Sequence, residues 1–355
     1  MEFVDLTRYM LVKSPLIPNF SELRNMKPVW MTQELQLIDE PSNITYAESL
    51  SKKGISVVKT RRRPPVRHHT EQSTFPYRIL FEMTSKCNFV CRMCPQQNLK
   101  RPKIHMPGEL YKKVIDEIDK HGVDGLWLYQ FGEPLLHPEF REILGHVSTK
   151  NNLGVIWLST NGRYFVEENI RLVLSSNIDY INFSAHAVTE ETYNTVAPPG
   201  NFEIVQANLE KFYELKGTTN LPRKPFLHCQ MIEQETTKHE IDIFIKKHYQ
   251  RAEIVSINML EHVEIPNNAF GFQQRERMPL TTCTKVSRND CLIYSNGDVT
   301  PCEAAYNSEI CFGNINEQSL YDIWNGEYRR KVLELNEQGR MSEIEFCCNC
   351  TDYDI

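Results

Sequence analysis

The chain has 355 residues, of which 41% are hydrophobic and 24% charged, and its formal net charge is −6. This composition is typical of a folded globular protein and excludes a long disordered or fibrous chain. The acidic balance gives no general attraction to nucleic acid or to an anionic membrane surface, so we expect neither as a partner.

Residues 1–73 form the first predicted region, an N-terminal extension with scattered prolines and no clear helix–strand pattern. It ends in the basic stretch KTRRRPPVRHH at 59–69, which we interpret as a solvated linker, with a phosphate-binding arm as the alternative. The first residues lack the basic start and apolar core of a signal peptide, and no apolar run reaches membrane-spanning length. We therefore expect a cytoplasmic location, where the eleven cysteines favour metal binding over disulfides.

From residue 74 onwards, strand-like and helix-like patterns alternate. Six apolar, strand-like stretches occupy residues 77–84, 125–134, 154–162, 180–186, 225–232 and 253–260. Amphipathic helical patterns occupy 108–122, 138–150, 166–176, 201–217 and 238–250, with Gly122 and Gly217 as expected helix ends. This alternation predicts an α/β fold in which the six units form a partial, TIM-like (β/α)6 barrel over residues 74–265. Functional residues in such folds lie at the carboxyl ends of the strands.

A loop with three closely spaced cysteines directly follows the first strand of this pattern. It reads CNFVCRMC and contains Cys87, Cys91 and Cys94. A zinc site normally has a fourth protein ligand nearby, and the adjacent sequence offers none. An iron–sulfur cube takes one thiolate per iron, so three thiolates would leave one iron open to an exogenous ligand.

Three further motifs follow at the expected ends of the next three strands: GEP at 132–134, STNG at 159–162 and FSAH at 183–186. With the cysteine loop they resemble the radical S-adenosylmethionine (SAM) superfamily over residues 75–260. The resemblance implies a [4Fe–4S] cluster on Cys87, Cys91 and Cys94, with SAM on the fourth iron. An electron from a flavodoxin- or ferredoxin-type reductant would then cleave SAM to a 5′-deoxyadenosyl radical that abstracts hydrogen from the substrate.

The resemblance also assigns residues around SAM. Glu133 would accept hydrogen bonds from the methionyl ammonium, while Gly132 would allow close backbone approach and Pro134 would stiffen the turn. The alternative for Glu133 is an ordinary solvent-facing glutamate in a turn.

Three more residues are implied at the cofactor site. Ser184 matches the family position that meets the ribose or carboxylate, and Asn161 lies where a polar side chain could do likewise. A serine or asparagine that caps a strand end is the structural alternative for both. The chain departs from the family pattern at Met93, where an aromatic residue often lies against adenine, although a polarizable methionine can also pack there.

A second group of cysteines follows in the C-terminal part of the chain, at Cys283, Cys291, Cys302, Cys311, Cys347, Cys348 and Cys350. Residues 266–355 resemble the auxiliary iron–sulfur domain that follows many radical SAM barrels, known as SPASM in its long form and twitch in its short form. We predict a small α+β domain of the short form, with a β-hairpin turning at Asn296–Gly297 and a helix over 317–336. It would hold one auxiliary [4Fe–4S] cluster on Cys283, Cys302, Cys347 and Cys350, with a structural zinc as the alternative.

An auxiliary cluster could accept an electron from a substrate radical, which suits dehydrogenation, whereas a thiol that returns hydrogen would give epimerisation. Candidate catalytic groups are the thiols Cys291 and Cys311, with Cys229 and Cys348 also spare, and the strand-end residues His186 and Glu261. Other candidate substrate contacts are His228, Gln230, Asn258 and His262. Relatives with a short auxiliary domain act on sugars and cyclitols, so we expect a polar small-molecule substrate. A peptide-modifying enzyme and a zinc-binding or inactive scaffold are the alternatives.

Overall fold

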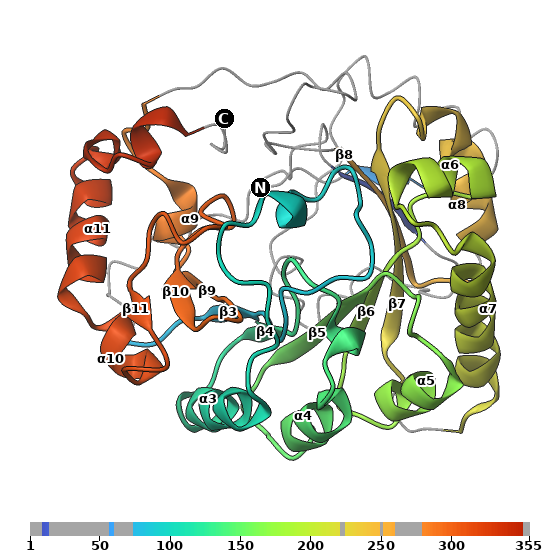
Figure 1. The fold of residues 1–355 in the computed structure, drawn as a ribbon, viewed down its shortest axis with the longest axis horizontal. Coiled ribbons are helices and arrows are strands. Elements are labelled where there is room, and N and C mark those ends of the chain that lie inside the picture. The colour runs from blue at the N-terminus through green and yellow to red at the C-terminus, as the bar shows by residue number, and fades with distance from the viewer. Residues whose placement is uncertain are drawn as a thin grey trace.

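The computed structural model describes residues 9–13, 57–59, 74–220, 224–248, 251–259 and 279–350. Its strands form one 11-stranded sheet in the order β11-β10-β9-β3-β4-β5-β6-β7-β8-β1-β2. Figure 1 shows this sheet curving as an open arc, with helices along its outer side. No described helix is long and apolar enough to cross a membrane.

Six consecutive strands in the middle of the sheet run parallel, as the sequence predicts. They are β3 (Arg78–Phe81), β4 (Gly125–Trp127), β5 (Val155–Thr160), β6 (Tyr180–Ser184), β7 (Phe226–Glu233) and β8 (Ile254–Met259). Each is the sheet neighbour of the next strand in the chain, which is the topology of a partial barrel built from right-handed βα units. The predicted fold class is confirmed.

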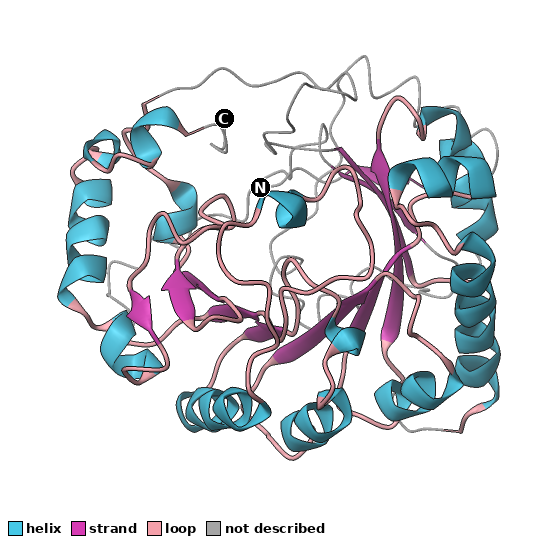
Figure 2. Ribbon diagram, in the orientation of Figure 1, coloured by secondary structure: helices cyan, strands magenta, loops and turns pink. Residues whose placement is uncertain are grey.

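Helices cover the convex face of these strands (Figure 2). They are α3 (Gly108–His121), α4 (Phe140–Val147), α5 (Glu167–Leu174), α6 (Glu190–Val196), α7 (Phe202–Thr218) and α8 (Ile241–His248). The short 3-10 turns η1 (Pro95–Asn98), η2 (Pro134–Leu136) and η3 (Lys238–Glu240) lie in the connections between strands and helices. Gly122 ends α3 with a φ of +77°, as predicted. The prediction that Gly217 ends a helix is wrong, because α7 continues to Thr218. The short helix α6 is not predicted by the sequence pattern.

The two faces of the sheet differ in burial. On β5, Ile156 and Leu158 belong to the large core under the helices, whereas Trp157 belongs to a separate apolar cluster on the concave face. On β6, Ile181 and Phe183 are fully buried, but Asn182 between them is only half-buried. The strands alternate in this way because successive side chains point to opposite faces of a sheet. The concave face is therefore where solvent reaches the interior of the barrel.

The C-terminal residues extend the barrel sheet directly. They form α9 (Thr284–Ser287), β9 (Asp290–Ile293), β10 (Asp298–Thr300), β11 (Gly313–Asn314), α10 (Leu320–Trp324), α11 (Glu327–Glu337), η5 (Met341–Glu343) and η6 (Cys347–Asn349). β9 pairs in parallel with β3, and β9 and β10 form the predicted hairpin, with Gly297 at φ +94° in its turn. The single helix expected over 317–336 is two helices, since Asn325 ends α10 and Gly326 caps α11.

Two strands from the N-terminal extension complete the other edge of the sheet. β1 (Tyr9–Lys13) pairs antiparallel with β8, and β2 (Val57–Lys59) pairs antiparallel with β1. The prediction that this extension lacks regular structure is wrong at these residues. The edge of β8 offers unpaired backbone groups, and the apolar sequences YMLVK and VVK suit a strand there. The basic stretch after Lys59 and the predicted domain boundary at 265/266 lie outside the described residues.

Candidate active site

The loop after β3 carries the three clustered cysteines. Each thiol lies near enough to another for their charges to interact, and burial is the main cause that raises the pKa of Cys87 to about 12 and of Cys94 to about 11. Burial also raises the pKa of Cys91 well above its usual value. Because metals bind the thiolate form, cluster assembly here must displace protons.

Backbone hydrogen bonds hold this loop against the barrel. Val90 N donates to Pro198 O at 2.7 Å and Arg92 N donates to Val196 O at 3.0 Å, which ties the loop to the end of α6. Gln96, in η1, donates its side-chain nitrogen to Ser85 O at 2.9 Å. The loop is thus held through its backbone and through the side chain of Gln96.

The GEP turn after β4 packs against the backbone of the cysteine loop. A Cβ added to Gly132 would lie 2.0 Å from Thr84 O, and Glu133 N donates to Lys86 O at 3.0 Å. The close approach expected at Gly132 is therefore an approach between two protein segments. Pro134 begins the 3-10 turn η2, where its fixed φ suits the first turn.

Glu133 is buried and accepts hydrogen bonds from both neighbouring strand ends. Its Oε1 accepts from Leu135 N at 3.1 Å and Thr160 Oγ1 at 2.9 Å, and its Oε2 accepts from Asn161 N at 2.7 Å. Burial raises its pKa to about 7. The alternative of a solvent-facing glutamate is wrong, since the side chain is 2% exposed. A carboxylate has about four acceptor sites, so one site remains for a ligand donor.

Asn161 connects Glu133 with the cysteine loop. Its side-chain nitrogen donates to Asn88 Oδ1 at 3.0 Å and to Cys87 Sγ at 3.7 Å. The structure thus brings Cys87, Glu133 and Asn161 together from three consecutive βα units, as expected for strand ends. Thr160 also belongs to this network, and its place in the STNG motif was the signal that could have identified it.

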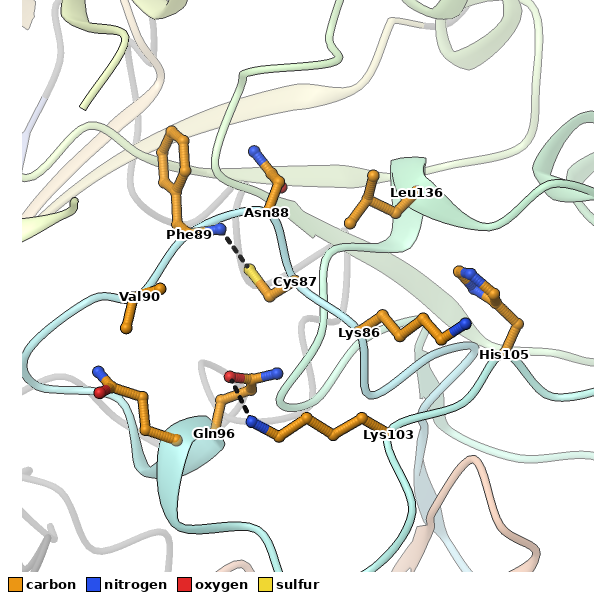
Figure 3. A pocket seen from close by; sticks show the side chains of 10 residues that line it. Lys86, Cys87, Asn88, Phe89, Val90, Gln96, Lys103, His105 and Leu136 are labelled. Carbon is orange, nitrogen blue, oxygen red and sulfur yellow. Dashed lines mark hydrogen bonds between the residues drawn. The ribbon is translucent and has the colours of Figure 1, made fainter. Parts of the chain in front are cut away.

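A cavity of about 720 Å³ opens beside the loop, and Cys87 and Phe89 lie on its wall (Figure 3). Lys86, Lys103 and His105 line it as well. The charge of Lys103 favours the thiolate of Cys94 and so opposes the effect of burial. Sequence reasoning missed these three residues, because single lysines or histidines in a loop form no motif; burial lowers the pKa of His105, which favours its neutral imidazole. Three thiols, an acceptor at Glu133 and the two lysines beside a cavity fit an anionic iron–sulfur cluster with a zwitterionic ligand.

The second group of cysteines gathers beside α11. Cys347 and Cys350 are buried in a small apolar cluster, and Cys283 packs against it. Burial, followed by the charges of Cys283, Cys350 and Cys348, raises the pKa of Cys347 to about 12. Cys302 is buried after β10. Its carbonyl accepts a hydrogen bond of 3.2 Å from the backbone nitrogen of Ala305, which belongs to the same apolar cluster as Cys347 and Cys350. Within the described residues, no three His, Cys, Asp or Glu side chains are arranged to hold one metal ion. A [4Fe–4S] cluster does not need such an arrangement, because each of its thiolates binds a different iron.

Comparison with known proteins identifies both cysteine-bearing regions. Residues 81–222 match the family model of the radical SAM superfamily, and residues 283–351 match the SPASM model, an iron–sulfur cluster-binding domain. The chain therefore has a radical SAM domain followed by a SPASM domain. Its domains imply a SAM-binding [4Fe–4S] cluster, SAM itself and auxiliary iron–sulfur binding.

Two curated relatives match over most of their length. The tungsten-containing aldehyde ferredoxin oxidoreductase cofactor-modifying protein of Pyrococcus furiosus is 22% identical over 294 residues, 70% of this chain and 81% of the relative. The S-adenosyl-L-methionine-dependent 2-deoxy-scyllo-inosamine dehydrogenase of Niallia circulans is 21% identical over 287 residues, 78% of this chain and 93% of the relative.

Solved radical SAM structures share the fold. BtrN in complex with AdoMet and 2-DOIA aligns with a TM-score of 0.51 at 19% identity, covering 79% of this chain and 95% of BtrN. Streptococcus suis SuiB bound to the precursor peptide SuiA aligns with a TM-score of 0.54 at 12% identity, covering 80% of this chain and 78% of SuiB. Native anSMEcpe with bound AdoMet aligns with a TM-score of 0.56 at 16% identity, covering 74% of this chain and 84% of anSMEcpe.

The remaining radical SAM site candidates lie in different places. Ser184 ends β6 on the concave face, half-buried and opposite Gln230, and Met93 is buried in the cysteine loop. His186 follows with a φ of +51°, and burial lowers its pKa to about 4. Its imidazole is therefore neutral at pH 7. Glu261 and His262, together with the side chain of Asn258, lie outside the described residues.

Two of the four spare thiols lie in the core under the helices, away from the concave side. Cys291, on β9, is fully buried in the core under the helices, where the charge of Arg329 in α11 acts on it. Cys229, on β7, lies in the same core with its Sγ 3.5 Å from Tyr213 Oη in α7. The structure does not bring these two thiols to the site. Cys311 is half-buried beside β11, and its Sγ donates to Gly313 O at 3.3 Å.

Proposed function

We propose that this chain cleaves SAM reductively and abstracts hydrogen from a polar small molecule of the sugar, aminoglycoside or cyclitol type. The observation that carries the proposal is the meeting of Cys87, Glu133 and Asn161 at three adjacent strand ends beside a cavity. When bound, SAM and the reduced cluster supply a 5′-deoxyadenosyl radical. The chain's own residues must place it and keep it from other reactants.

Each of these residues has a proposed part in that task. Cys87, Cys91 and Cys94 would hold the cluster. Glu133 would use its remaining acceptor site for the methionyl amino group, with a short, charge-assisted hydrogen bond. Asn161, fixed by Glu133 and Asn88, would orient the thiolate of Cys87 through its side-chain amide.

We favour dehydrogenation over epimerisation. Cys283, Cys302, Cys347 and Cys350 would hold one auxiliary cluster, which could accept the second electron from a substrate radical. The orientation of Cys229 and Cys291 supports this reaction, because a thiol in the core under the helices cannot return hydrogen to a substrate on the concave face. Cys311 and Cys348 remain as candidate donors for epimerisation.

The coverage of the Niallia circulans dehydrogenase, 93% of its length, supports a small-molecule substrate. A peptide substrate is the second candidate. It is favoured by the likeness to SuiB bound to its precursor peptide and by a 30% identity over 140 residues to mycofactocin maturase MftC of Mycobacterium tuberculosis.

The test is anaerobic reconstitution with iron and sulfide, followed by incubation with SAM and dithionite or a reduced flavodoxin. We expect 5′-deoxyadenosine from the wild-type protein and none from a Cys87→Ala/Cys91→Ala/Cys94→Ala variant, which serves as the control. Cleavage of SAM by this variant, or a wild-type protein that takes up zinc and leaves SAM intact, would contradict the proposal. Deuterium uptake from solvent into a product would indicate epimerisation instead of dehydrogenation.

A further inference from the structure

The concave face of the barrel has an aromatic floor near the start of the strands. Trp127, Trp157, Tyr180 and Phe226 come from four neighbouring strands, β4 to β7, and belong to one apolar cluster. Trp157 stacks on Tyr180 at a centroid distance of 4.0 Å, and Tyr180 stacks on Phe226 at 5.3 Å. Trp157 and Tyr180 are 2% and 0% exposed, so the stacked rings form a closed, rigid base beneath the concave face.

Above this floor, towards the cysteine loop, lies a row of uncharged polar side chains: Ser159, Asn182, His228, Gln230 and Ser256. We call it the polar row. Asn182 Nδ2 donates to Ser159 Oγ at 3.3 Å and to Gln230 Oε1 at 2.6 Å, and His228 Nε2 lies 2.6 Å from Ser256 Oγ. The row thus crosses β5, β6, β7 and β8 on the concave face.

Two polar atoms around the polar row lack a hydrogen-bond partner among the described residues. Asn182 Oδ1 and Tyr180 Oη are both buried. A buried acceptor without a donor is unfavourable, by about 1–3 kcal/mol in general. A ligand hydroxyl that donates to Asn182 Oδ1 would remove that cost.

The polar row carries no charge at neutral pH. Burial lowers the pKa of His228 to about 4, so its imidazole is neutral. Glu82, the acidic residue that directly follows β3, is already paired with Arg101 through two hydrogen bonds of 2.6 and 2.7 Å. Among the described residues, the row therefore offers nothing to compensate a phosphate, whereas amides and hydroxyls match the hydroxyls of a neutral ring.

We propose that the polar row, whose members Ser159, Asn182 and Gln230 are half-buried, binds an uncharged, hydroxylated ring of the substrate, with Asn182 as a specificity-determining residue. This inference rests on the proposed function and narrows its substrate class. It places hydroxyl groups, rather than a charged group, at the reacting end of the substrate, since the row lies between the floor and the cysteine loop.

The test uses the oxidised, cluster-loaded protein with SAM bound, a state in which SAM is not cleaved. Isothermal titration calorimetry with scyllo-inositol and D-glucose as probes should show binding of at least one neutral ring. Binding of D-glucose 6-phosphate and GTP should be weaker than that of the neutral ring. Tighter binding of a phosphorylated probe, or no binding of either neutral ring, would overturn the proposal.

Variants at Asn182 make the test specific. Asn182→Leu should weaken neutral-ring binding about tenfold by removing an uncharged hydrogen-bonding group, while the exposed control Asn151→Leu should not change it. Asn182→Asp should shift preference towards D-glucosamine, because a carboxylate attracts the ammonium group. Unchanged affinity in Asn182→Leu would overturn the proposal. SAM cleavage by the wild-type protein without substrate is measured separately, and its absence would count against the proposed function instead.

Discussion

At the scale of single residues, Glu133 combines burial with three hydrogen-bond donors. The donors Leu135 N, Thr160 Oγ1 and Asn161 N favour the carboxylate, yet burial outweighs them and raises the pKa to about 7. The free protein therefore titrates at this residue close to physiological pH. Buried groups with such a pKa are often functional.

A pH dependence of SAM binding follows from this pKa. A carboxylate is needed to accept from the methionyl amino group, and a pKa raised to about 7 means that it is protonated below that pH. We expect the affinity for SAM to fall as the pH decreases from 7.5 to 5.5, by up to about tenfold per unit. Calorimetric titration of the cluster-loaded protein with SAM at several pH values measures this affinity.

Glu133→Gln provides the comparison. The neutral amide should bind SAM about 10 to 100 times more weakly at pH 7.5 and should show a smaller pH slope. The difference between the two slopes isolates Glu133 from the titration of SAM itself. Equal slopes in both proteins would remove Glu133 from the binding step.

Gly132 is the second residue with a measurable consequence. Gly132→Ala would place a Cβ 2.0 Å from Thr84 O, so the GEP turn or the cysteine loop must move. We expect a loss of about 1–3 kcal/mol in the free energy of unfolding and less iron bound per chain.

The matched control is Gly217→Ala. Gly217 lies inside α7 with no atom within 4 Å of an added Cβ, so alanine should raise the free energy of unfolding by about 1 kcal/mol. Chemical denaturation and iron analysis measure both variants. A tolerated Gly132→Ala with full iron content would show that the two segments adjust freely.

At the scale of elements, a buried ion pair joins the cysteine loop to the β9–β10 hairpin. Glu82 at the end of β3 pairs with Arg101, and the two side chains are 1% and 3% exposed. Ser295 N in the hairpin turn donates to Glu82 Oε1 at 3.0 Å, and Arg101 Nε donates to Tyr306 O at 2.8 Å. The pair therefore connects the segments that carry the two cysteine groups.

Breaking this pair should be costly. Arg101→Met leaves the carboxylate of Glu82 buried without its cation, so we expect a loss of about 3–5 kcal/mol in the free energy of unfolding. Arg141→Met, which removes an exposed pair with Glu168, should cost no more than about 1 kcal/mol. Equilibrium denaturation compares the two. A similar small effect in both variants would mean that the hairpin does not depend on this ion pair.

At the scale of the whole molecule, the cysteines occupy two kinds of position. Most lie in the loop after β3 or beside α11, whereas Cys229 and Cys291 lie in the core under the helices. Cys347 lies near Cys283, Cys348 and Cys350 beside α11, whereas Cys291 lies in the core under the helices. We therefore expect the thiol of Cys347 to bind iron and the thiol of Cys291 to remain unligated.

Iron analysis tests that separation. Cys347→Ser should lower the iron content of the reconstituted protein by about four atoms per chain, which is one cube, while the first cluster still supports SAM cleavage. Cys291→Ser should retain the iron content of the wild-type protein. Unchanged iron in Cys347→Ser, or the same loss in Cys291→Ser, would contradict the proposed ligand set.

The sheet shows how much of the architecture can be predicted from sequence. Its six parallel strands and most of the covering helices follow from apolar periodicity, which is a local signal. The break at Asn325–Gly326 and the strands β1 and β2 do not, because short segments without strong periodicity depend on the partner they pack against. The hairpin at Asn296–Gly297 was predictable because its turn residues specify its geometry.

The sequence by itself determined the fold class and the family, because the spacing of CNFVCRMC and the order of GEP, STNG and FSAH are properties of the linear chain. Only the tertiary structure decided which thiols face the core, that Gly132 meets Thr84, and that Asn182 lies beside Gln230. These relations depend on strand register and on which sheet face the helices cover. Contacts between residues far apart in sequence determine the register and the covered face, so local sequence patterns do not predict them.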